Sequence, residues 1–206
     1  MTKQASMPST RTLPALLAAT LLVSIVSCGD AAPSAQPIPR IVVEGSRARD
    51  YKSLDELAEK SNAVLVVKPT GTQSAVPLPQ RNGGTPESAP TLLVQVEVVR
   101  ILSGSVSDDV INIVSPGIDE NTGKQALLNG GPYIVFVAPA MYAANDPVGG
   151  YVIVGGPTGL FASRGAQDVF ERVDSESSLL PAEVSLNATK FPKITKTEEQ
   201  LLYEGP

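Results

Sequence analysis

The chain has 206 residues, a formal net charge of −5 and a pI near 4.8, which suit one or two small domains and offer no basic surface for a nucleic-acid backbone. It contains no histidine, no tryptophan and a single cysteine, so Ser–His or Cys–His catalysis and histidine-ligated metals are excluded. With 17 glycines, 18 prolines and 18% charged residues, the composition favours a small globular body with irregular loops over a helical bundle.

The N-terminus has the pattern of an export signal. Lys3 and Arg11 precede a 14-residue apolar stretch over residues 13–26, with no acidic residue among them. As a helix rising 1.5 Å per residue this stretch reaches about 21 Å, which is short of the roughly 30 Å hydrocarbon core of a bilayer. It therefore predicts a cleaved signal peptide over residues 1–27 rather than a membrane span.

The apolar stretch ends with Ile25 and Val26, and Ser27 and Cys28 follow directly. This ending resembles the lipobox of bacterial lipoproteins, in which the cysteine becomes the acylated first residue of the mature chain. An exported protein with one thiol has no internal partner for it, whereas a lipidated Cys28 needs none. The resemblance implies anchoring to the extracytoplasmic face of the cell membrane through fatty acyl chains such as palmitate. The alternative is an ordinary secretory signal followed by a chance cysteine.

Cleavage after residue 27 changes the charge of the chain. It removes Lys3 and Arg11 and no acidic residue, which leaves 14 basic against 21 acidic side chains and a net charge of −7. We therefore expect the domain neither to lie flat on an anionic bilayer nor to bind nucleic acid. Residues 28–40 are small, polar and spaced by prolines, and predict a flexible tether between lipid and domain.

The first segments of the domain predict a helix, a strand and a loop. Ser53 and Glu56 form a capping box, and apolar residues follow at helical spacing, so residues 53–61 predict a short helix with one buried face. Residues 63–67 are continuously apolar and β-branched, which is typical of a strand buried on both faces. Residues 71–90 contain several prolines and glycines without periodicity and predict a long surface loop.

The second half of the chain predicts several more short strands. From residue 91 apolar side chains alternate with polar ones, as in a half-buried antiparallel strand. Further apolar segments, separated by glycine turns, are residues 110–114, 133–137, 151–154, 160–162 and 168–173. Near the end, Thr197 and Gln200 form a second capping box, which gives a weak helix signal over residues 197–203.

Short, closely spaced strands joined by glycine turns are typical of a small sandwich or barrel. We expect a mainly β fold, a small OB-like antiparallel barrel with one short helix, over residues 41–175. The signal peptide and the tether precede it, and residues 176–206 follow as a polar C-terminal tail. A doubly wound parallel sheet would need long helical crossovers between its strands, and the sequence predicts none.

Four predicted features follow one another along the chain. They are the helix over residues 53–61, a strand that begins at Ala63, a strand that ends at Gly104 and a strand that a glycine-x-tyrosine sequence opens at Tyr133. This order resembles the netrin and tissue-inhibitor-of-metalloproteinase type of OB fold over about residues 50–165. The disulfide cysteines of that family are missing. Its inhibitors chelate zinc through a free N-terminal cysteine, a mechanism that is not expected here because an acylated cysteine has no free amine.

Three polar or glycine-rich segments each have a functional and a structural interpretation. Residues 119–123 resemble the first half of a calcium loop, but Gly130 stands where a closing glutamate is needed, which favours a surface turn. Residues 155–159 follow a strand without the helix that a dinucleotide site needs, which favours a bulge or hairpin corner. Asp108 and Asp109 are adjacent, so they are expected in a turn rather than as a catalytic pair.

These observations favour a non-catalytic binding or assembly module, with another cell-envelope protein as its candidate partner. Cys28 is assigned as the lipidation site, and no catalytic, cofactor-binding or metal-binding residue is assigned. The alternative is a cell-envelope hydrolase or transferase that uses carboxylates or a tyrosine, for which Asp119, Glu120 and Tyr133 are the candidates. A concave pocket lined by two or more buried carboxylates would favour the enzyme. The expected contact surface is the loop over residues 71–90.

Overall fold

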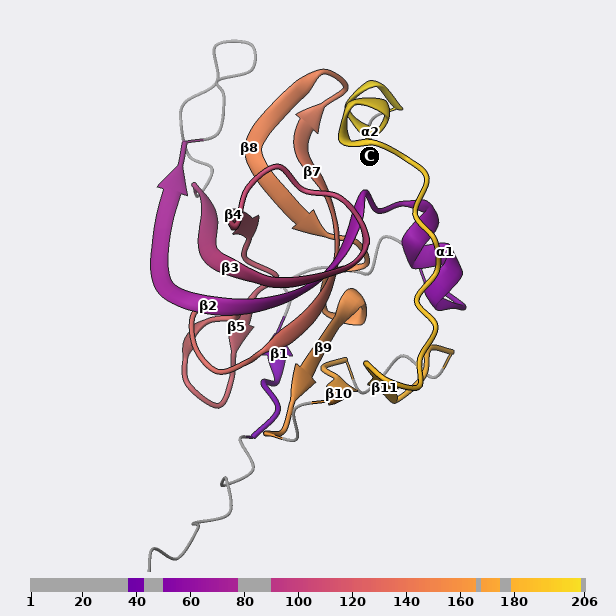
Figure 1. Ribbon diagram of the computed structural model, residues 1–206. Helices are drawn as coiled ribbons and strands as arrows, with labels where there is room; N and C mark the ends of the chain where they lie inside the picture. Colours follow the sequence, from indigo (N-terminus) through magenta and orange to yellow (C-terminus); the bar gives the residue numbers. More distant parts are fainter. Residues whose placement is uncertain (1–36, 43–49, 78–89, 166–167, 175–178, 205–206) are drawn as a thin grey trace, which may run out of the picture. The chain divides into compact units, whose positions relative to one another are not determined.

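The computed structural model (Figure 1) describes residues 37–42, 50–77, 90–165, 168–174 and 179–204. The expected signal peptide, Cys28 and the tether before residue 37 lie outside these residues. The chain divides into two units, Met1–Ala32 and Pro33–Pro206, and the second contains every described residue. In the described ranges, neither helix has the length and apolar character needed to cross a membrane.

The described chain is mainly β, as expected. Its elements follow in the order β1 (Ile41–Val42), α1 (Leu54–Glu59), β2 (Ala63–Val76), β3 (Thr91–Gly104), β4 (Val110–Val114), β5 (Ile118–Asp119), β6 (Lys124–Gln125), β7 (Tyr133–Ala143), β8 (Asp146–Ile153), the 3₁₀ turn η1 (Gly156–Gly159), β9 (Leu160–Ser163), β10 (Val169–Arg172), β11 (Glu183–Ser185) and α2 (Glu198–Glu204). β1, β5 and β6 form a small separate sheet.

Five strands form a barrel-like sheet. β2 pairs with β3 along its length and with β7 over residues 63–67. β3 pairs with β4, and β7 pairs with β8, in each case antiparallel. A single parallel pair, Ile113 of β4 opposite Tyr151 of β8, brings the order β7–β2–β3–β4–β8 back to β7 without complete closure. This partly open five-strand order confirms the expected OB-like barrel, with one parallel contact in place of a wholly antiparallel sheet.

Two apolar cores lie on the two faces of the sheet. Alternate side chains of a strand point to opposite faces. Ala63, Leu65 and Val67 of β2 therefore belong to the inner core of the barrel, while Val64 and Val66 belong to an outer core, which α1 covers. All five are buried, which confirms the expected strand with two buried faces.

Both capping boxes are present at the helix starts. The amide of Glu56 donates to Ser53 Oγ at 3.2 Å, while the Glu56 carboxylate accepts from the amide of Lys52 rather than from that of Ser53. At α2 the exchange is complete, because the Gln200 amide donates to Thr197 Oγ1 and the Thr197 amide donates to Gln200 Oε1. Both predicted helices are confirmed to within a residue or two at each end.

The second half of β2 corrects the expected loop over residues 71–90. Gln73 to Val76 pair with Val94 to Thr91, so β2 continues as a strand through residue 76, and residues 78–89 lie outside the described part. The register shifts between Pro69 and Gln73, where Gly71 has a φ of +79°. Residues 70–75 are all exposed, so the strand has no apolar alternation that the sequence could reveal.

The residues after 178 contribute to the fold, although the sequence suggests a polar tail there. β11 pairs with β10 and extends the sheet through β9 to β7. Leu180, Val184 and Leu201 are buried, and Phe191 and Ile194 pack against the outer core. These apolar side chains follow no regular period among the polar ones, and they pack against the outer core.

The glycines of residues 155–159 form neither a bulge nor a hairpin corner. They make the 3₁₀ turn η1, which leads from β8 into β9. Gly159 is required there because a Cβ atom at this position would lie 2.1 Å from the carbonyl oxygen of Val154. The continuation of this turn as a strand agrees with the sequence argument against a dinucleotide site.

Candidate functional site

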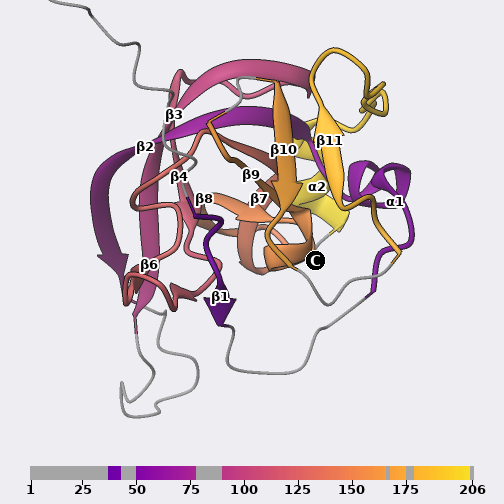
Figure 2. The same cartoon turned by 90° about the horizontal axis from the view of Figure 1, so that it is seen from below.

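The chain enters the domain at a fixed point close to β5. Ile38 and Ile41 pack against the inner core. The amide of Arg40 donates to Asp119 Oδ1 at 3.0 Å, and Asn121 Nδ2 donates to the Ile38 carbonyl at 3.1 Å. β1 lies at the lower end of the barrel in Figure 1 and at the front in Figure 2, which views the protein from below. The end of the barrel that carries β1, β5 and β6 is called the tether end below.

Asp119 is a structural acceptor at the tether end. Its side chain is buried, and its carboxylate accepts hydrogen bonds from the amides of Arg40 and Asn121 and from Thr122 Oγ1, at 3.0 to 3.1 Å. Glu120, in contrast, is exposed and forms an ion pair with Arg40 at 3.0 Å. The two neighbouring acids therefore point to different surroundings and do not form a catalytic pair.

Tyr133, the third residue of the enzyme alternative, is also held in a structural role. Its hydroxyl donates to the Asn129 carbonyl at 2.8 Å. Burial, and secondly the charge of Asp119, raises the pKa of Tyr133 to about 12. The phenol is therefore protonated at neutral pH and is a poor general base.

Residues 119–123 form the turn of the β5–β6 hairpin, in agreement with the surface-turn interpretation. The amide of Gly123 donates to the Asp119 carbonyl at 2.8 Å, which closes the turn. Across the described ranges, no group of three or more His, Cys, Asp or Glu side chains is arranged to hold a metal ion. Asp108 and Asp109 are exposed in the connection from β3 to β4, as expected of turn residues.

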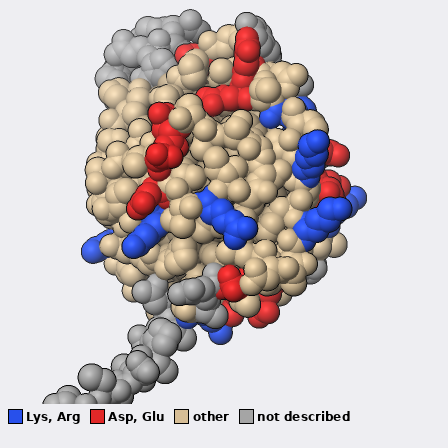
Figure 3. Space-filling model, in the orientation of Figure 1, with Lys and Arg blue, Asp and Glu red and all other residues tan. Residues whose placement is uncertain are grey.

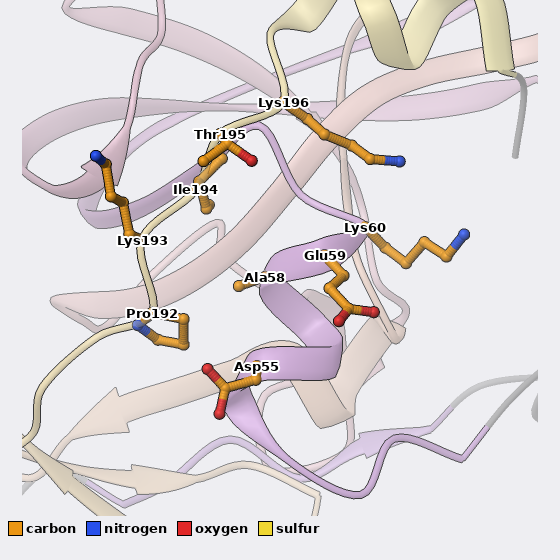
Figure 4. A pocket seen from close by; sticks show the side chains of 9 residues that line it. All are labelled: Asp55, Ala58, Glu59, Lys60, Pro192, Lys193, Ile194, Thr195 and Lys196. Carbon is orange, nitrogen blue, oxygen red and sulfur yellow. The ribbon is translucent and has the colours of Figure 1, made fainter.

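A groove of about 380 Å³ lies between α1 and residues 190–196, which we call the strap (Figure 4). The strap connects β11 with α2. The groove has an apolar floor, which consists of Ala58 from α1 and of Pro192 and Ile194 from the strap. The complete lining is Asp55, Ala58, Glu59, Lys60, Pro192, Lys193, Ile194, Thr195 and Lys196.

The rim of the groove carries both signs of charge. Asp55 and Glu59 are four residues apart and so lie on one face of α1. Lys193 and Lys196 come from the strap, and Lys60 stands at the end of the helix. Figure 4 shows the Lys60 and Lys196 side chains extending to the same side. Figure 3 shows basic and acidic side chains close together on the side of the molecule where Figure 1 places α1 and the strap.

The main chain of the strap is partly unpaired. Exposure alternates along residues 193–196, which indicates an extended conformation. The amide of Ile194 donates to Ser103 Oγ of β3 at 2.9 Å. Its neighbours Lys193 and Thr195 form no hydrogen bond or ion pair with any other described residue.

The groove was not foreseen from the sequence, because the strap lies within the expected polar tail. Residues 191–197 have no regular alternation of polar and apolar side chains, so the sequence carries no local signal of an extended segment. The carboxylates at the rim, Asp55 and Glu59, are exposed. The groove therefore does not meet the criterion of two buried carboxylates, and its chemistry favours binding over catalysis.

Comparisons of the chain with protein-family models, with curated proteins and with solved structures give no match.

Proposed function

We propose that the mature protein is a lipoprotein, anchored through Cys28 to the extracytoplasmic face of the bacterial cell membrane. The observation that carries this proposal is the apolar stretch over residues 13–26, which ends directly before Ser27 and Cys28. The packing of Ile38 at the tether end agrees with it, because Ile38 follows Cys28 by only ten positions. Fully extended, ten residues span at most about 35 Å, so the tether end stays close to the bilayer.

We further propose that the barrel is a non-catalytic binding or assembly module for another cell-envelope protein. The groove supports this function, because it combines an apolar floor with charged groups that suit recognition. Asp119 and Tyr133 are engaged in structural hydrogen bonds, which leaves the enzyme alternative without a supporting site. The proposed likeness to netrin-type domains extends to the barrel and not to zinc chelation.

Metabolic labelling with an alkyne fatty acid tests the anchor. We expect label and membrane association in the wild type and the loss of both in Cys28→Ala. Ser34→Ala, in the proposed tether, is the matched control and should keep both. Persistence of label and membrane association in Cys28→Ala would contradict lipidation at this residue.

A panel of envelope substrates, comprising peptides, esters and glycans, tests the non-catalytic function. We expect the mature protein to turn over none of them. Turnover that is lost in Tyr133→Phe or Asp119→Asn, with the fold intact by circular dichroism, would establish the enzyme alternative instead.

A further inference from the structure

We propose that Asn129 is a site of spontaneous chemical modification, in which its side-chain amide becomes a carboxylate. Asn129 and Gly130 lie in the connection between β6 and β7, outside any helix or strand. The reaction consumes only water, so the inference does not depend on the anchor or on the binding function proposed above. Three features carry it: an exposed amide without a partner, a glycine directly after it, and the tyrosine whose packing requires that glycine.

The side-chain amide of Asn129 is available for reaction. The residue is exposed, and among the described residues neither this amide nor the main-chain amide of Gly130 has a hydrogen-bond partner. Asn121 and Asn187 are also exposed, but Nδ2 of each donates a hydrogen bond to an oxygen atom of another segment. At Asn129, in contrast, neither the amide carbon nor the neighbouring nitrogen is held away from the other by a hydrogen bond.

The fold requires a glycine at the next position. Gly130 has a φ of +78°, and a Cβ atom there would lie 2.8 Å from the hydroxyl oxygen of Tyr133. The Tyr133 side chain is buried, and its hydroxyl donates to the Asn129 carbonyl at 2.8 Å, so it is not free to move aside. Glycine has no side chain to shield its own nitrogen. The packing of Tyr133 therefore keeps the nitrogen beside Asn129 unshielded.

The reaction joins groups of two adjacent residues, so it is intramolecular and needs no external catalyst. The Gly130 nitrogen forms a bond to Cγ of Asn129, the bond from Cγ to Nδ2 breaks, and the side-chain nitrogen leaves as ammonia with the proton of the Gly130 amide. The product is a succinimide ring. Water then opens the ring at one of its two carbonyl carbons and returns a proton to the nitrogen. One opening gives aspartate and the other gives isoaspartate, and neither step oxidises or reduces any atom.

The isoaspartate product changes the surroundings of Tyr133. In aspartate the main chain is unchanged and the new charge lies on an exposed side chain. In isoaspartate the main chain passes through Cγ, and the carbonyl that accepts the Tyr133 hydrogen bond becomes a free carboxylate. The main chain also gains one carbon atom in the connection that leads into β7. We therefore expect the isoaspartate form to be less stable than the unmodified protein.

Peptide mapping by mass spectrometry tests the inference. The purified mature protein, in detergent micelles, is incubated in mildly alkaline buffer, which promotes loss of the amide proton, and is digested with trypsin at intervals. The tryptic peptide 125–164 contains both Asn129 and Asn145, which are exposed. Conversion at Asn129 should be at least about tenfold faster than at Asn145, because Asp146 has a side chain and belongs to β8.

Asn129→Gln is the matched variant. It keeps a side-chain amide at this position, but the attack would have to close a larger ring, so the peptide should stay unmodified over the same interval. The sequence repeats the pair at Asn82 and Gly83, outside the described residues. Trypsin releases that pair in the separate peptide 82–100, so the two sites are measured independently.

Urea unfolding of the incubated protein provides a second readout. The wild type should develop an additional transition at lower urea as isoaspartate accumulates, whereas Asn129→Gln should keep a single transition. A single transition in converted wild type would contradict the consequence drawn for Tyr133. Absence of conversion at Asn129, or equal conversion at Asn129 and Asn145, would overturn the inference. Neither result bears on the lipid anchor, which the labelling of Cys28 decides separately.

Discussion

Asp119 joins the segment before β1 to the β5–β6 turn through one buried carboxylate. Its acceptor oxygens satisfy the amides of Arg40 and Asn121 and the hydroxyl of Thr122, and Arg40 lies 79 residues away in the sequence. Hydrogen bonds to a charged acceptor contribute more to stability than those between neutral groups. The residue that looked most like part of a catalytic cluster therefore has a clear structural role, and its loss should affect stability.

Asp119→Ala should lower the free energy of unfolding by about 1–3 kcal/mol, because it removes three part-buried hydrogen bonds to a charged acceptor. Urea unfolding of the purified protein measures the effect. Glu120→Ala is the control, since this exposed ion pair should contribute less than about 1 kcal/mol. Similar losses in the two variants would argue against the role given to Asp119.

Tyr133 should make stability depend on alkaline pH. Its pKa is raised from 10.0 to about 12 in the folded protein, first by burial and then by Asp119. The folded state thus favours the protonated phenol, so the contribution to stability is complete below pH 10 and is lost as the pH rises toward 12. Urea unfolding over this window should show the loss, and Tyr133→Phe should show a smaller one. Parallel pH profiles for the two proteins would contradict the assignment.

Substitutions at Gly104 and Gly71 allow the cost of backbone strain to be distinguished from the cost of steric overlap. Both have a positive φ, but a Cβ at Gly104 would lie 2.0 Å from the carbonyl oxygen of Asn62, whereas one at Gly71 meets nothing within 4 Å. Gly71→Ala should cost about 1–2 kcal/mol from strain alone. Gly104→Ala should cost at least about 3 kcal/mol in thermal or urea unfolding, because strain and overlap add. Equal costs would show that β2 and β3 can move apart at this point.

At the scale of elements, the helices and strands that could be predicted are those whose local residue pattern alone determines their secondary structure. Residues 63–67 are apolar on both faces, and both helices begin with a capping box, so these were foreseen. The second half of β2 was not foreseen. Its exposed, small and polar residues form a strand because they pair with β3, and their own sequence carries no strand pattern. The same holds for the groove, whose walls come from segments more than 130 residues apart in the chain.

α2 provides a test of whether the end of the chain belongs to the domain. Leu201 is buried, and the Tyr151 hydroxyl donates to Glu198 Oε2 at 2.9 Å. Leu201→Ala should therefore lower the free energy of unfolding by about 2 kcal/mol or more through the cavity that it leaves. Glu199→Ala, an exposed position on the same helix, should change it by less than about 0.5 kcal/mol. A detached tail would give no change in either variant.

At the scale of the whole molecule, the proposed anchor gives the barrel an orientation. The tether end carries β1, β5 and β6, and Figure 1 places the β7–β8 turn at the opposite end. A label on Lys124→Cys should transfer energy to a membrane-bound dye more efficiently than a label on Ala144→Cys. In the proposed lipoprotein the Cys28 thiol carries lipid, so each variant would have one reactive thiol. Equal transfer from both positions would show that the tether imposes no orientation.

The long-range hydrogen bonds described above also determine when folding can finish. Arg40 pairs with a residue 79 positions later, and Ile194 with one 91 positions earlier, so both ends of the domain pack on its middle. Non-local contacts of this kind slow folding and leave apolar surface uncovered while the chain is incomplete. A chain emerging N-terminus first cannot cover its outer core until the strap and α2 have appeared. Premature termination even ten residues short should therefore yield a species prone to aggregation rather than a slightly shortened domain.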